Sequence, residues 1–158
     1  MFFAKKRHDE SRLSVQNLAM VPALRMVRQI QISMLVSIAL YAIAGETLSR
    51  TMNRIPGNVL FHAFSLISIS LVGATVVVRR TLVLPSEAVL RKHSDDPLAL
   101  SRWRSGHIVL YALSEVLGLF GLILRMVGFT LANVCGFYLG AFLLLLLYSP
   151  RAPRPQVS

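Results

Sequence analysis

One acidic residue, Glu115, lies near the middle of an otherwise uncharged run from His107 to Leu124. A run of about 20 apolar residues spans the ~30 Å hydrocarbon core of a bilayer. An acid at that depth is costly to bury and usually serves a function. Tyr41, Ser68 and Tyr138 are predicted at similar depth, and Ser68 and Tyr138 form with Glu115 a candidate site for a proton or a sodium ion. The alternative is a neutral glutamate that ties helices together by hydrogen bonds.

A second acid and base lie near the ends of apolar runs. Glu46 follows the run that starts at Gln29, and Arg125 follows the run that contains Glu115. If those two helices touch, we expect an interfacial ion pair, because arginine can contact a carboxylate through two N–H groups. The alternative is that each side chain reaches water separately.

Small residues mark where helices can approach closely. Gly136 and Gly140 form a GxxxG pattern, and Gly118 and Gly121 lie on the run that contains Glu115. Glycine at such spacing allows close helix crossing in membranes. We therefore predict helix packing at all four positions.

No constellation typical of an enzyme is visible, because the sequence has no nucleophile–base set, phosphate loop or metal-ligand spacing. We predict a non-enzymatic protein with no metal or cofactor other than the proton or sodium ion at Glu115. His62 and His107 are separate candidates for a pigment ligand, although an interfacial histidine is the simpler interpretation. Cys135 is the single cysteine, so an intramolecular disulfide is excluded.

The composition is that of a membrane protein. Of 158 residues, 54% are hydrophobic and 15% are charged, whereas soluble domains average ~45–50% and ~25%. The net charge of +10 comes from basic residues that flank the apolar runs. That placement favours topology signals and contact with anionic lipid headgroups over nucleic acid binding.

The apolar runs predict an all-α fold, an integral membrane four-helix bundle of two helical hairpins. Short amphipathic helices at the cytoplasmic surface are predicted at Leu13–Val27 and Leu98–Arg104. The second would start at Asp96-Pro97, which suits a helix N-cap and first turn, and Trp103 would anchor it at headgroup level. The predicted segments are a basic N-terminal segment (1–28), a first transmembrane hairpin (29–78), a basic loop with an interfacial helix (79–106), a second hairpin (107–148) and a disordered tail (149–158).

The basic residues also predict orientation. Of the 17 Lys and Arg residues, fourteen fall in residues 1–28, 79–106 and 149–158, and three on the other side. Cytoplasmic segments carry the excess of Lys and Arg. We therefore expect a multi-pass protein of a bacterial inner membrane, with both termini and residues 79–106 in the cytoplasm.

The segment Ser114–Leu124, with sequence SEVLGLFGLIL, resembles the carboxylate helix of the rotor-ring proteolipid (c-type) subunits of rotary ATPases. The resemblance covers these residues only, and it places the carboxylate on the first helix of a hairpin instead of the second. It implies that Glu115 binds a transported proton or sodium ion.

Three functions follow as hypotheses. The first is a non-enzymatic membrane subunit that assembles with itself or with a larger complex through residues 107–148. The second is a proton or cation translocator that uses Glu115. The third is a pigment- or cofactor-binding subunit.

Overall fold

Four helical rods make up the protein in the computed structural model, which describes residues 2–49, 57–92 and 96–150. The second rod is one continuous helix that consists of α2, a short π-helical stretch called η1, and α3. The elements are α1 (Phe2–Ser49), α2 (Asn58–Val78), η1 (Arg79–Val83), α3 (Leu84–Lys92), α4 (Pro97–Val127) and α5 (Leu131–Leu147).

Within the described residues, three helical segments are long and apolar enough to cross a bilayer, namely Val21–Leu48, Asn58–Arg91 and Pro97–Val127. Helix α5 is a shorter apolar helix of 17 residues, at the lower end of the ~17–25 residues that span hydrocarbon. Large apolar side chains such as Leu66 and Leu143 face outward. By helix length and composition, the chain is an integral, multi-pass helical membrane protein.

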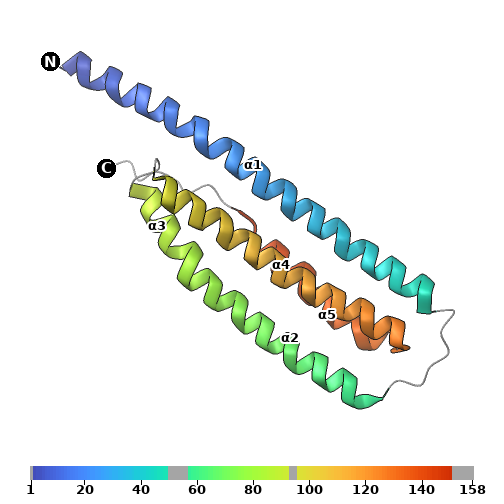
Figure 1. Ribbon diagram of the computed structural model, residues 1–158. Helices are drawn as coiled ribbons and strands as arrows, with labels where there is room; N and C mark the ends of the chain where they lie inside the picture. The colour runs from blue at the N-terminus through green and yellow to red at the C-terminus, as the bar shows by residue number, and fades with distance from the viewer. Residues whose placement is uncertain (1, 50–56, 93–95, 151–158) are drawn as a thin grey trace.

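Helix α4 is the centre of the bundle, and it packs against α1, α2, α3 and α5. Figure 1 shows it between α1 and α2, with α5 alongside. Its buried residues recur every three or four positions, which is the period of one helix face. They include Trp103, Leu110, Tyr111, Ser114, Leu117 and Leu124.

The second predicted hairpin is present, and the first is not a closely packed pair. Helices α4 and α5 are antiparallel neighbours joined at Gly128, whose positive φ of 109° ends α4 in the left-handed conformation that glycine adopts readily. Helix α1 packs on α4 and α5, whereas α2 packs on α4. The buried face of α4 therefore separates the two helices that were predicted to pair.

The prediction that residues 79–106 form mainly a loop is wrong, because helices occupy this stretch on both sides of residues 93–96. The apolar rod of α2 continues through η1 into α3, and the Leu84 N–H bonds to the Arg79 carbonyl, five residues back. This π-helical shift directly precedes Pro85, which lacks an N–H. The extension packs on α4 at Gly106, where a Cβ would lie 2.8 Å from Val83 Cγ2.

The predicted helix start at Asp96-Pro97 is confirmed, but the helix is not the short surface one expected. The Asp96 carboxylate accepts the backbone N–H groups of Leu98 and Ala99 at 2.9 and 3.3 Å. Helix α4 then runs without interruption into the apolar segment. Trp103 is fully buried and lies against His107, with ring centroids 4.5 Å apart. It is therefore a core residue and not an anchor at headgroup level.

The predicted boundary between residues 28 and 29 does not coincide with a helix end. Helix α1 is continuous from Phe2 to Ser49 and includes Pro22. From Ala23 onward it buries side chains against the bundle, and this packing offsets the backbone hydrogen bond that proline removes. Most side chains of the predicted amphipathic helix Leu13–Val27, and the tail beyond residue 150, lie outside the described part of the chain.

Candidate functional site

Glu115 joins the two longest helices of the bundle. Its Oε1 atom accepts a hydrogen bond from the Tyr41 hydroxyl of α1 at 2.8 Å, and the contact is partly buried. Gly118, one turn farther along α4, lies against Ile38 and Tyr41, so the helices are close at this level. The carboxyl therefore acts as a polar tie between α1 and α4.

The other two residues of the predicted ion site do not join Glu115. The Ser68 hydroxyl donates to the Phe64 carbonyl of its own helix at 2.7 Å. The Tyr138 hydroxyl is buried and has no hydrogen-bond partner among the described residues. Its ring lies against Gly121, six residues and ~9 Å along α4 from Glu115. Depth alone placed the three side chains together, whereas the helix faces separate them.

Replacement of Glu115 tests the polar tie. Glu115→Gln retains an acceptor for Tyr41, so we expect thermal unfolding in detergent to change little. Glu115→Leu leaves the tyrosine hydroxyl without its partner and is expected to cost ~0.6–1.7 kcal/mol, the range for hydrogen bonds between membrane helices. Tyr41→Phe is the matched control and should cost a similar amount. Equal destabilisation by Gln and Leu would contradict this role and point to the charge itself.

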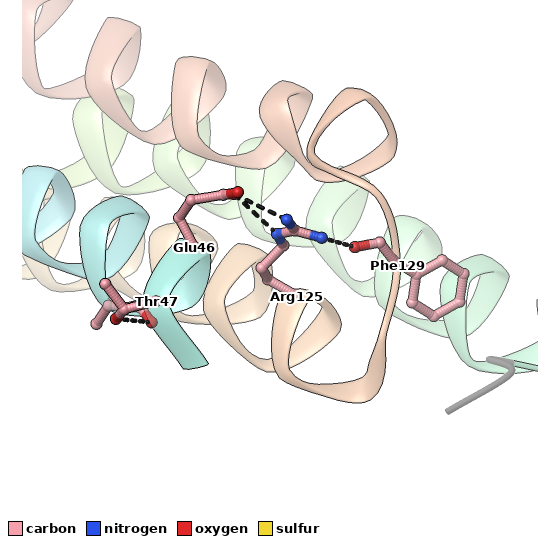
Figure 2. Close-up of polar contacts among 5 residues, drawn as sticks. Glu46, Thr47, Arg125 and Phe129 are labelled. Atoms are coloured by element: carbon pink, nitrogen blue, oxygen red, sulfur yellow. Dashed lines mark hydrogen bonds and ion pairs between the residues drawn. The ribbon is translucent and has the colours of Figure 1, made fainter. Parts of the chain in front are cut away.

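Glu46 and Arg125 contact one another near the C-terminal end of α1, five residues beyond Tyr41 (Figure 2). Arg125 donates through Nε and Nη2 to one oxygen, Glu46 Oε2, at 3.2 and 2.8 Å. Its third nitrogen, Nη1, donates to the Phe129 carbonyl at 2.7 Å, just beyond Gly128. One guanidinium therefore fastens the end of α1, the end of α4 and the turn into α5.

Gly45 makes room for this cluster. A Cβ at position 45 would lie 3.0 Å from the Tyr138 hydroxyl and 3.1 Å from Arg125 Cγ. The absence of a side chain lets the tyrosine and the arginine pass directly beside α1. Tyr138 thus belongs to the Glu46–Arg125 end of the bundle and not to the level of Glu115.

The four predicted packing glycines occupy two different environments. Gly118, Gly121 and Gly140 face other helices of the same chain, with Gly140 closest to Leu117. Gly136 is exposed and has nothing within 4 Å of its Cβ position. It lines an apolar groove of about 450 Å³ between α2 and α5, together with Phe61, Ser65, Leu117 and Phe137. We call this the α2/α5 groove.

Comparison with protein-family models, with curated protein sequences and with solved structures found no match. The resemblance of residues 114–124 to the rotor-ring proteolipids remains a prediction from the sequence.

The two candidate pigment histidines lie at opposite ends of the bundle, His62 on α2 and His107 on α4. His62 is exposed near the start of α2, whereas His107 is buried and lines a cavity with Arg79 at the other end. Arg79 lies 17 residues after His62, which corresponds to ~25 Å of helix. The histidines therefore do not share a site, and the ring nitrogen Nδ1 of His107 lies 3.0 Å from the Trp103 carbonyl.

Sequence reasoning missed Gln31 as a structural contact. Its side-chain nitrogen Nε2 donates to the Leu145 carbonyl at 2.7 Å, and the contact is buried. This bond joins α1 to the last turn of α5. An amide within an apolar segment is the signal that could have identified it, because such groups hydrogen-bond across membrane helices.

Proposed function

We propose that this chain is a non-enzymatic membrane subunit that assembles, with its own copies or with a larger complex, through the α2/α5 groove. The observation that carries the proposal is the position of Gly136. Its exposed backbone lies in the wall of a groove, so a helix from outside the chain can approach it closely. In lipid, where apolar surface is not driven together as in water, such close packing favours association.

A polar group at the same groove supports the proposal. Asn133 is exposed and lines the groove one turn before Gly136. Its side-chain amide makes no hydrogen bond within the described part of the chain, whereas its backbone N–H bonds to the Thr130 carbonyl. An amide in this position can bond to a neighbouring helix and fix its register.

Gly136→Ile tests assembly. The branched side chain fills the point of closest approach, so we expect association to weaken by ~1 kcal/mol or more, with thermal unfolding of the single subunit unchanged. Native mass spectrometry after gentle detergent extraction measures the assembly and separates homo-oligomers from mixed complexes.

Gly73→Ile is the matched control for that experiment. Gly73 is also an exposed helical glycine with nothing within 4 Å of its Cβ position, but it does not line the groove. It should leave assembly intact. If Gly136→Ile assembles like the parent, or if both variants lose assembly equally, the groove is not the interface.

The charge distribution supports an orientation with both termini and residues 79–106 on the cytoplasmic face of a bacterial inner membrane. Maleimide labelling of an Ala88→Cys variant, with Cys135 replaced by serine, tests this orientation, since Ala88 is exposed on α3. Labelling only from the outer face would show that the orientation is the reverse of the one proposed.

A further inference from the structure

A second cavity of about 450 Å³ opens where α3, α4 and the end of α5 meet. We call it the basic cavity. Its polar lining includes Arg79, Glu87, Arg91, His107 and Tyr148. The first three come from a single continuous helical rod in which η1 joins α2 to α3 without a break, and all three side chains line the cavity.

The two arginines of the basic cavity are available to an anion. Among residues 21–48, 57–91 and 96–150, the one ion pair is Arg125–Glu46. Neither Arg79 nor Arg91 therefore forms an ion pair with Glu87, and the guanidinium of Arg79 lies 5.4 Å from the centre of the Tyr148 ring. Stacking on tyrosine positions an arginine while leaving its N–H groups free. With two arginines against one glutamate, the cavity favours a ligand with one negative charge.

The level of the basic cavity in the membrane indicates where such an anion would come from. Three apolar runs end beside it: α2 at Val78, α5 at Leu147, and the apolar part of α4 at His107. Basic residues beside the ends of apolar runs are typical of the boundary between hydrocarbon and headgroups, where lipid phosphates lie. Leu84 and Leu147 line the same cavity and are 45% and 68% exposed. They offer apolar surface for acyl chains directly beside the two arginines.

We infer that the basic cavity binds the phosphate of an anionic phospholipid, held by Arg79 and Arg91 with its acyl chains along Leu84 and Leu147. Arginine contacts phosphate oxygens through pairs of N–H groups, and basic pockets between membrane helices suit lipid headgroups. Glu87 limits the negative charge that the cavity accepts. The site lies apart from the α2/α5 groove and does not depend on the proposed assembly.

Titration of the purified full chain with phosphatidylglycerol in a non-ionic detergent, followed by native mass spectrometry, tests the inference. We expect one lipid bound per chain. Arg79→Gln and Arg91→Gln should each weaken binding at least about tenfold, because each removes a charge-assisted contact. Glu87→Gln should strengthen binding a few-fold, because it removes a like charge, and a gain of affinity cannot arise from misfolding.

Arg80→Gln is the matched control, since Arg80 is exposed, carries the same charge and does not line the cavity. It should change binding less than about twofold, because it leaves the phosphate contacts intact. Equal losses of lipid affinity in the Arg80 and Arg79 variants would overturn the inference and indicate general attraction of the lipid to a basic surface. Equal binding of phosphatidylcholine would overturn the preference for an anionic lipid. Displacement of the lipid by millimolar inorganic phosphate would overturn the inference of a lipid site and indicate that the cavity binds a free anion.

Discussion

Arg125→Gln is expected to lower the free energy of unfolding by about 2–3 kcal/mol. The substitution removes both bonds to Glu46 Oε2 and the bond to the Phe129 carbonyl. The Arg125 side chain is 15% exposed and that of Glu46 is 40% exposed, so the contact is largely shielded from solvent on the arginine side. The loss therefore exceeds that of a surface ion pair, which is worth ~0–1 kcal/mol. Thermal or chemical unfolding in a fixed detergent measures it.

Arg125→Lys separates charge from geometry. Lysine keeps the positive charge but cannot reach the Glu46 carboxylate and the Phe129 carbonyl together through a planar fork. We expect it to recover less than half of the loss. Glu46→Gln should cost less than Arg125→Gln, because the bond from Nη1 to the Phe129 carbonyl remains. A full recovery by lysine would show that charge alone stabilises this end of the bundle.

The apolar runs were sufficient to predict the helices but not how they pack. Runs near 20 residues with basic flanks identify membrane helices, and Asp96-Pro97 and Gly128 mark the two ends of α4 because capping chemistry is local. The pairing of α1 with α4 cannot be deduced from such local signals. It depends on which face of each helix carries small residues, and a single sequence does not rank such faces.

Charged stretches next to membrane segments were the main source of error. Residues 79–106 were predicted as a basic loop with one short interfacial helix, yet a helix can leave the membrane and continue into the headgroup region with its charges exposed. Once α3 and the start of α4 are seen as packed helices, the burial of Trp103 follows. The basic cavity could not be predicted for the same reason, since it forms only when α3 packs against α4.

The candidate residues were predicted with mixed success. Depth along each helix, at ~1.5 Å per residue, placed Tyr41 near the level of Glu115. It also placed Tyr138 there, although the Tyr138 ring faces Gly121. Depth fixes one coordinate, and the rotation of each helix about its axis fixes the other. That rotation is set by close packing at positions such as Gly121, where the space available to each side chain is smallest.

Gly121→Val should therefore be strongly destabilising, by about 2–3 kcal/mol. A Cβ at position 121 would lie 2.9, 3.0 and 3.1 Å from three atoms of the Tyr138 ring. The ring is rigid and 8% exposed. Its hydroxyl is confined beside the Gly45 position, which Arg125 also lines. The ring cannot move without disturbing the Glu46–Arg125 contact. Unfolding in detergent measures the loss, and Gly73→Val, at an open glycine of α2, is the control.

A second substitution tests whether the Tyr138 ring is the cause. Tyr138→Leu replaces the ring with a smaller side chain. The double variant Gly121→Val/Tyr138→Leu should therefore be more stable than the sum of the two single losses predicts, by ~1 kcal/mol or more for residues in direct contact. Strictly additive losses would mean that valine acts on the backbone of α4 instead. The packing of α5 against α4 would then not be set by this glycine.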